Sequence, residues 1–242
     1  MSGRNVGATG ICAALALALA ACGGGQSQAE APGGGEDTAP VQKGRSSLSV
    51  SSEIGALDEA ETQEVFKRAA SKLSRCFEKG LRRVPYMGGE VRVAVRVSMD
   101  GSTRWAYVKD SSLGDLETEQ CMLQAIKGAT WPKPVGGEGL AENSYTFDPS
   151  PDERQPVSWA PEQLGKGFEE VQPKLASCRS GASTGALKAT LYVDPDGKVV
   201  TAGVSGSDEK ADGAVRCVVE ALREVKFPSP GSYDAKVSVT IE

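Results

Sequence analysis

Cysteine is the residue type in this sequence whose chemistry is easiest to assign. The chain has 242 residues and six cysteines. Arg4 and the apolar stretch 11–21 have the layout of a secretory signal peptide, residues 1–21, which would carry Cys12 away with it. Past Cys22, four cysteines remain in the exported chain, and an even number predicts two disulfides. They are Cys76, Cys121, Cys178 and Cys217. No two of them have a Cys-x-x-Cys spacing, which argues against a zinc site.

A different reaction is predicted at Cys22. The tetrapeptide Leu19-Ala20-Ala21-Cys22 resembles the lipobox of bacterial lipoproteins. The resemblance implies cleavage before Cys22 and lipidation, including palmitate, which would anchor the chain in a lipid bilayer. The alternatives are an ordinary signal peptide with an Ala-x-Ala site and a transmembrane helix, although the apolar run is shorter than the ~20 residues a bilayer requires. Gly23 lacks the aspartate that retains lipoproteins in the inner membrane of some bacteria, so the outer membrane is favoured.

The composition excludes several kinds of chemistry. There is no histidine, which rules out Ser-His-Asp and Cys-His catalysis and histidine-ligated metals. Lys and Arg total 27 against 32 Asp and Glu, a net charge of -5 that predicts neither a nucleic-acid partner nor a polybasic membrane patch. No carboxylates form a recognisable acid–base pair by their spacing. We therefore expect no enzyme activity, cofactor, metal or small-molecule substrate.

A polar segment follows the predicted anchor. Residues 22–52 are rich in Gly, Ser, Ala, Gln and Pro and lack apolar periodicity. Such a segment cannot bury enough apolar surface to order itself, so it is predicted to be a disordered tether.

The rest of the chain contains an internal repeat. Asp100-Gly101 precedes Cys121 at the same spacing at which Asp196-Gly197 precedes Cys217. A proline-rich segment then follows each of these cysteines at the same offset: Trp131-Pro132-Lys133-Pro134 in the first copy and Phe227-Pro228-Ser229-Pro230 in the second. The first copy is longer between its first cysteine and the Asp-Gly turn. The sequence thus predicts two tandem domains, residues 53–149 and 157–242.

Each copy is predicted to fold as helix, hairpin, helix and strand. Valines at alternate positions in 91–97 indicate a half-buried strand, and Asp100-Gly101 supplies the turn into its partner. In the second copy, Pro173 is expected to kink or split the first helix. Helices covering one face of a small antiparallel sheet give an α+β fold with two tandem α-β-β-α-β lobes.

The predicted order of helices and strands in each copy also predicts the disulfide pairs. In each copy one cysteine ends the first helix and the other lies early in the second. Cys76–Cys121 and Cys178–Cys217 are therefore expected. A crossed pairing would tie the copies together, and it is disfavoured because each lobe can close its own bridge.

The element order, the Asp-Gly hairpin and the Trp/Phe-Pro-x-Pro ending resemble the AgmX/PglI C-terminal domain, a relative of the TonB C-terminal domain on envelope proteins. The resemblance covers roughly residues 57–148 and 161–242, and the second copy departs from it at 205–208. It implies TonB-C-like lobes that bind proteins, typically by adding a strand to a sheet edge. It carries over no catalytic residues. It does not imply energy transduction, since a lipid on Cys22 cannot replace the transmembrane helix of a TonB-type transducer.

A binding patch is predicted on the first copy. If the valines of 91–97 face the helices, then Trp105 and Tyr107 point to the opposite face of the sheet. The basic residues expected beside them are Arg92, Arg96 and Lys109. Exposed aromatic and basic residues together are typical of protein interfaces. The alternatives are cross-strand packing on a surface that binds nothing, or a bulged turn that buries both rings.

Basic residues also gather between Lys67 and Arg83, along the first helix. Glutamates are interspersed, so a solvated face with i,i+4 ion pairs is the expected explanation, and binding to acidic lipid or glycan is the alternative.

Together these features predict a non-catalytic, lipid-anchored envelope protein that binds or scaffolds another envelope protein, with a link to motility or envelope assembly. The alternative is a structural surface lipoprotein, or spacer, with no specific partner.

Overall fold

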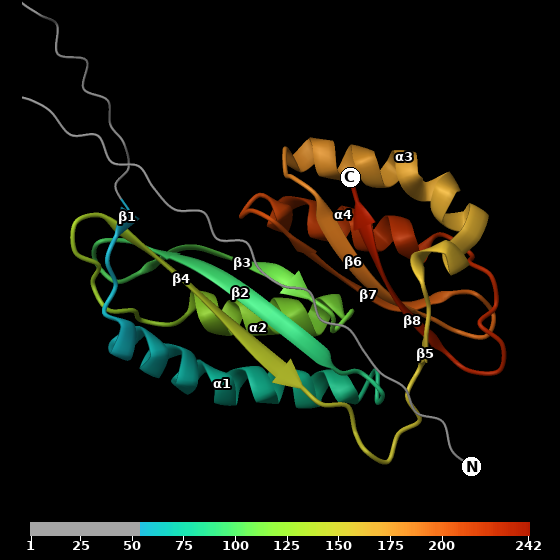
Figure 1. The fold of residues 1–242 in the computed structure, drawn as a ribbon, viewed down its shortest axis with the longest axis horizontal. Helices are drawn as coiled ribbons and strands as arrows, with labels where there is room; N and C mark the ends of the chain where they lie inside the picture. Colours follow the sequence, from blue (N-terminus) through green and yellow to red (C-terminus); the bar gives the residue numbers. More distant parts are fainter. Residues whose placement is uncertain (1–53) are drawn as a thin grey trace, which may run out of the picture. The chain divides into compact units, whose positions relative to one another are not determined.

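The computed structural model describes residues 54–242, and these belong to one compact unit (Figure 1). The predicted signal peptide 1–21, the lipidation site Cys22 and the tether 22–52 lie outside the described residues. Within 54–242 no helix is both long enough and apolar enough to cross a membrane.

The unit consists of two lobes with the same order of elements. The first contains β1 (Ile54–Gly55), α1 (Glu59–Leu81), β2 (Gly89–Val97), β3 (Thr103–Ser111), α2 (Leu116–Lys127) and β4 (Glu138–Phe147). The second contains β5 (Val157–Ser158), the 3-10 helix η1 (Pro161–Leu164), α3 (Gly165–Ala182), β6 (Leu187–Val193), β7 (Val199–Gly206), α4 (Ala211–Arg223) and β8 (Ala235–Ile241). The α+β class and the repeated α-β-β-α-β order are confirmed.

Each lobe has a four-stranded sheet whose strand order is equivalent in the two copies. The orders are β1-β4-β2-β3 and β5-β8-β6-β7. The long strands are antiparallel, whereas the two-residue strands β1 and β5 pair in parallel with the start of β4 and β8. These two short strands were not predicted from the sequence. Because they are so short, they cover only one end of the strand that they join.

The helices form where capping and apolar spacing predict them. The Asp58 side chain caps α1 by accepting a hydrogen bond from the Glu61 amide at 2.8 Å. Gly101 and Gly197 have φ values of 87° and 80°, which glycine tolerates best, and they close the two predicted hairpin turns. The expectation that Pro173 splits its helix is wrong, because α3 runs unbroken through it. Proline has no amide hydrogen, so the Glu169 carbonyl lacks its usual donor within the helix. Because Pro173 and Glu169 are both exposed, water can hydrogen-bond to this carbonyl instead.

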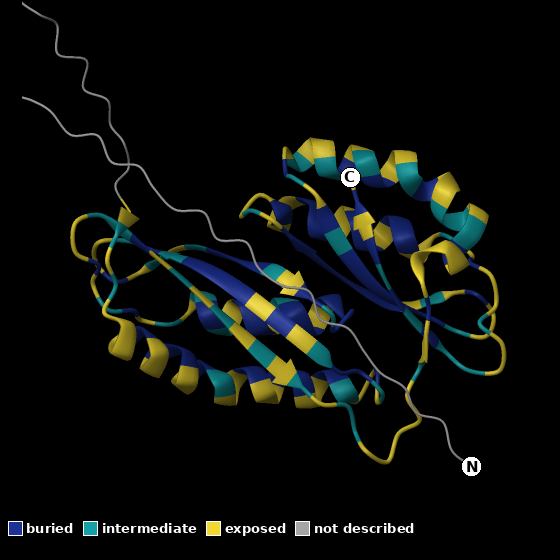
Figure 2. Cartoon of the chain, viewed as in Figure 1, coloured by how far each residue is buried: buried dark blue, intermediate teal, exposed yellow. Residues whose placement is uncertain are grey.

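A hydrophobic core lies between the helices and the sheet of each lobe, and Figure 2 shows the buried residues along these faces. The two cores also share residues across the lobe boundary. Leu116 of α2 belongs to the core of the second lobe, and Tyr192 of β6 belongs to the core of the first. The lobes are therefore packed against each other and form a single folded block.

The structure pairs the cysteines as predicted. Cys76–Cys121 joins α1 to α2, with the two Cα atoms 5.7 Å apart. Cys178–Cys217 joins α3 to α4, with the Cα atoms 5.6 Å apart. Both distances are normal for a disulfide. Each bridge thus lies within one lobe and fastens its two helices over the same sheet.

Candidate functional site

The predicted aromatic patch has the expected register but not the expected exposure. Ala106 pairs with Val95 and Trp105 with Arg96, so Trp105 and Tyr107 do lie on the face away from the helices. Tyr107, however, is only 7% exposed. Its hydroxyl donates a hydrogen bond to the Ser207 carbonyl of the second lobe at 3.1 Å. The prediction of an exposed aromatic pair is therefore wrong for Tyr107, because the second lobe covers it. Trp105 is half-buried.

The basic residues of the patch are held by two glutamates of β4. Arg92 lies 2.9 Å from Glu142, and Lys109 pairs with the same carboxylate. Arg96 lies 2.5 Å from Glu138, which Arg104 also contacts. The hydrogen bond from Arg104 lowers the pKa of Glu138, desolvation opposes this shift, and the hydrogen bond from Arg96 adds to the lowering. These glutamates were not predicted from the sequence, although residues 138 and 142 lie with the exposed Leu140 along one face of β4.

The outer strands of the two sheets, β3 and β7, lie beside each other. The Ser111 amide donates to Ser205 Oγ at 3.2 Å, and Thr190 Oγ1 donates to the Ser111 carbonyl at 3.2 Å. Side chains on the helix-free face of the second sheet are buried against the first lobe as a result. They are Thr190, Tyr192, Thr201 and Ser205. The strands β3 and β7 thus lie within the contact between the lobes.

The additional residues between α1 and β2 form part of the same contact. Tyr86 packs against Tyr192 and Tyr233, with ring centroids 5.4 and 6.1 Å apart. Its hydroxyl also donates a hydrogen bond to Asp234. Burial raises the pKa of Tyr86, and the neighbouring Asp234 carboxylate raises it further. In the sequence only the length of this segment sets it apart from the second copy. The structure shows that Tyr86 of this segment contacts the second lobe.

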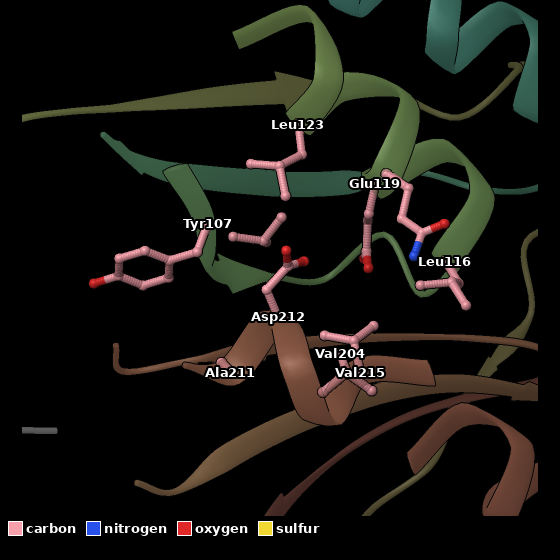
Figure 3. A pocket seen from close by; sticks show the side chains of 10 residues that line it. Tyr107, Leu116, Glu119, Leu123, Val204, Ala211, Asp212 and Val215 are labelled. Atoms are coloured by element: carbon pink, nitrogen blue, oxygen red, sulfur yellow. The ribbon is translucent and has the colours of Figure 1, made fainter. Parts of the chain in front are cut away.

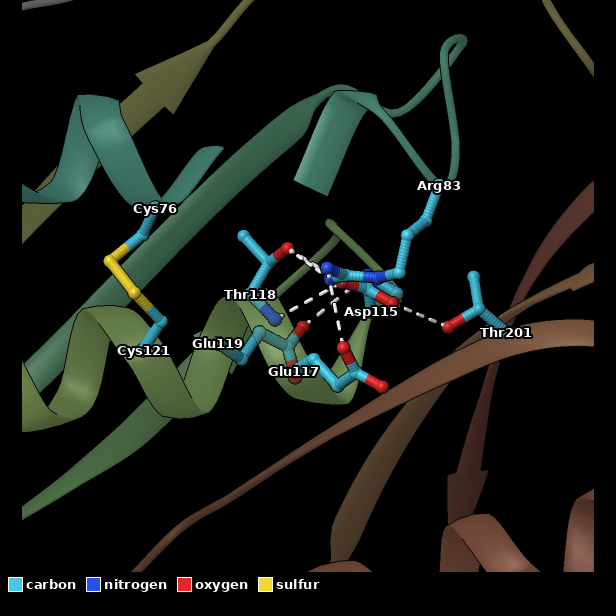
Figure 4. A network of polar contacts seen from close by, with 9 residues as sticks. Cys76, Arg83, Asp115, Glu117, Thr118, Glu119, Cys121 and Thr201 are labelled. Atoms are coloured by element: carbon cyan, nitrogen blue, oxygen red, sulfur yellow. Dashed lines mark hydrogen bonds and ion pairs between the residues drawn. A yellow bond between two sulfur atoms is a disulfide. The ribbon is translucent and has the colours of Figure 1, made fainter. Parts of the chain in front are cut away.

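A polar network lies at the start of α2, beneath the second lobe (Figure 4). The Asp115 side chain caps the helix by accepting hydrogen bonds from the Thr118 amide at 3.1 Å and the Thr118 hydroxyl at 2.6 Å. Arg83 donates to it from one side and Thr201 of β7 from the other, at 2.5 and 2.8 Å. Burial alone would raise the pKa of Asp115, but these hydrogen bonds outweigh it and lower the pKa. Asp115 is therefore an ionised, well-paired link between the lobes.

Glu119, one turn further along α2, is in the opposite situation. It is 2% exposed, and only its Oε1 is hydrogen-bonded, by the Ser111 hydroxyl at 2.6 Å and the Gly114 amide at 3.3 Å. Its Oε2 has no hydrogen-bond partner among the described residues. The carboxyl packs on Gly203 so closely that a Cβ there would lie 2.3 Å from Oε1. Desolvation raises the pKa of Glu119 to about 7, despite the hydrogen bond from Ser111. The clue in the sequence is its spacing from Met122 and Leu123, on the apolar stripe of the helix.

A small cavity adjoins Glu119, between α2 and the second lobe (Figure 3). Leu116, Leu123, Val204 and Val215 are among the residues that line it, and its volume is about 20 Å³. A space of this size fits a water molecule and no organic substrate. Among residues 54–242 no cluster of acidic or cysteine side chains has the arrangement of a metal site.

Two sheet edges remain open in the described part of the chain. β1 pairs with β4 only at Glu138 and Gly139, and β5 pairs with β8 only at Ala235 and Lys236. Beyond those pairs no described strand lies on the outer side of β4 or β8. The pairing of β4 with β2 is continuous from Gly139 to Phe147, without a bulge. The outer edge of β4 is thus a long, regular row of backbone donors and acceptors.

No protein-family model matches the chain, and no curated protein sequence matches it. One solved structure found by comparison is the NMR solution structure of the TonB C-terminal domain of Helicobacter pylori, residues 179–285. The two sequences are 22% identical, and the match covers 41% of this chain and 100% of that one, with a TM-score of 0.26. The two-lobe α+β fold follows from this chain's own strand order and burial.

Proposed function

We propose that this chain is a non-catalytic envelope lipoprotein that binds another envelope protein by accepting one of its strands at the outer edge of β4. The proposal combines the open edge in the structure with the lipobox resemblance at Cys22 and the motif resemblance to AgmX/PglI C-terminal domains. The lipid on Cys22 would hold the folded block at a bilayer, with the outer membrane favoured. The tether 22–52, with a typical span of ~25–30 Å, would let it reach a partner.

The observation that carries this proposal is the exposed edge of β4 from Leu140 to Phe147. Half of the backbone groups of an edge strand point away from the sheet and are free to pair with an added strand. Natural edges are usually protected by proline, by a bulge or by a covering element. β4 contains no proline and no bulge, and β1 covers only its first two residues.

The side chains along β4 are compatible with an added strand. Ala141, Tyr145 and Phe147 pack against the core of the first lobe and hold the strand in place. On the other face Leu140 is 43% exposed, which gives an incoming strand an apolar contact beside the ion pairs of Glu142. This exposed apolar group favours a binding role over that of an inert spacer, for which a wholly polar edge is expected.

Site-specific photo-cross-linking in intact cell envelopes tests the proposal. A benzoyl-phenylalanine at Ser144, exposed on β4, is compared with the same replacement at Ser177, exposed on α3, in the full chain. We expect a discrete covalent adduct to one envelope protein at position 144 and none at 177. Equal adducts at both positions, or none at 144, would contradict binding at this edge.

A further inference from the structure

The exposed side of α1 carries a row of five basic residues. They are Arg68, Lys72, Arg75, Lys79 and the C-cap residue Arg82. Their spacing alternates between four and three residues, which places all of them along one side of a helix. At 1.5 Å per residue the row is ~21 Å long. All five residues are exposed. We call this row the basic face of α1.

None of these five side chains forms an ion pair with a described residue. The one ion pair within the described part of α1 joins Lys67 and Glu64, at 3.5 Å, and involves neither the row nor Glu61 or Glu78. The basic residues are exposed, as expected of a solvated face, but the expected i,i+4 ion pairs are not found among the described residues of α1. The basic residues beside β4, by contrast, are paired with Glu138 and Glu142. The net charge of -5 for the whole chain conceals this local concentration of positive charge.

A groove lined by both apolar and polar residues runs along the same flank of α1. Its floor contains Val65, Ala69, Ala125 and Ala129, and Arg68 and Lys72 lie at its rim. Its volume is about 370 Å³. A second groove continues past Arg68 to Trp131 and Pro132, and Glu61 and Glu64 also line it, beyond the N-terminal end of the basic row. Cations beside a groove that contains both polar and apolar groups match a ligand that has anionic groups next to apolar ones, as the headgroup region of a bilayer does.

We propose that the basic face of α1 docks onto the anionic headgroups of a lipid bilayer. A straight row of cations fits a plane of phosphates, and the groove beside it accepts the apolar portion of the lipids. α1 begins at Glu59, a few residues after the tether, and in a chain anchored at Cys22 a tether with a typical span of ~25–30 Å keeps this helix within reach of the membrane. That nearness rests on the proposed function, whereas the charge and shape of the surface do not.

Chemical labelling of lysines tests this on the full chain reconstituted on vesicles through its own anchor. Labelling by an amine-reactive ester is measured on vesicles of pure phosphatidylcholine and on vesicles with added phosphatidylglycerol. On the anionic vesicles, labelling of Lys72 and Lys79 is expected to fall about fivefold, the factor by which one cation near an anionic surface favours contact. The matched control is Lys166, exposed on α3, whose labelling should not change.

The variant Arg68→Glu/Arg75→Glu is expected to remove the protection, since it leaves the labelled lysines in place but reverses two charges of the face. Unchanged labelling of Lys72 and Lys79 on the anionic vesicles would overturn the proposal. Protection by free polyglutamate but not by anionic vesicles would also overturn it and would identify an acidic protein as the occupant. A negative result on vesicles would leave the cross-link at Ser144 untouched, so the two proposals fail independently.

Discussion

Replacing Cys178 and Cys217 together by alanine is expected to lower the free energy of unfolding by about 4 kcal/mol. The bridge closes a loop with a sequence separation of 39 residues, and cross-linking such a loop removes conformational freedom chiefly from the unfolded chain. A loss of this size is a large fraction of the stability of an ordinary domain. Equilibrium unfolding in urea measures it. The companion pair Cys76 and Cys121, with a separation of 45, should give a similar loss.

Ser180→Ala, on the exposed side of α3, is the matched control and should unfold within ~0.5 kcal/mol of the unmodified protein. A loss below ~1 kcal/mol for the cysteine pair would show that packing alone holds the helices over the second sheet, and it would contradict a stabilising role for the bridge.

Glu119→Gln is expected to abolish a pH dependence of stability between about pH 4.5 and 7. The carboxyl has an ordinary pKa of 4.5, and burial raises the pKa to about 7 in the folded protein. Below pH 4.5 both states hold the proton, so the carboxyl imposes no penalty. As the pH rises towards 7, the unfolded chain releases the proton and the folded chain retains it, so stability falls. Above pH 7 the loss is complete and is roughly 3 kcal/mol.

Glutamine preserves the shape of the side chain and carries no charge, so the variant should be more stable than the natural protein at pH 8 and similar to it at pH 4.5. Urea unfolding at a series of pH values measures this difference. Glu220→Gln, exposed on α4, serves as the control and should follow the natural protein at every pH. If the free energy of unfolding depended on pH in the same way for Glu119→Gln and for the natural protein, this would contradict the conclusion that burial raises the pKa of Glu119. Asp115 does not interfere with this measurement. Its pKa is lowered in the folded protein, so its contribution to the free energy of unfolding is lost only at more acid pH.

The elements within each lobe were predictable because their signals are local. The alternating valines of β2 determine which residues face the helices, and the register of Val95 with Ala106 is as expected. Positive-φ turns at Gly101 and Gly197 follow from the Asp-Gly pairs. The disulfide partners followed from the presence of one cysteine in each of the two helices of a copy, since helices of the same lobe lie close enough to be joined.

The contact between the lobes was not predictable from the same patterns. Alternation in β6 and β7 shows that Thr190, Thr201 and Ser205 leave the apolar core, but it does not show whether water or another lobe covers them. Polar groups of the first lobe contact these side chains; for example, the Thr201 hydroxyl donates a hydrogen bond to the Asp115 carboxylate. Tyr107 was expected to be exposed for the same reason. Glu119 was overlooked because charged residues on a helix are usually solvated.

This packing bears directly on the proposed binding role. Because β3 and β7 lie within the contact between the lobes, the free edges of the described block are the outer sides of β4 and β8. β4 offers the longer open stretch and the exposed Leu140. The two copies of the repeat therefore differ in the length of the strand edge that they leave open, although their strand orders are equivalent.

Amide hydrogen exchange of the full chain, compared between intact cell envelopes and purified protein, tests strand addition at β4 most directly. Backbone amides of an open edge that point outward exchange quickly, and pairing with an added strand slows them. We predict slower exchange within Leu140–Phe147 in envelopes, with α3 unchanged as an internal control. Identical exchange of this strand in envelopes and in the purified protein would contradict the proposal that β4 receives a partner strand.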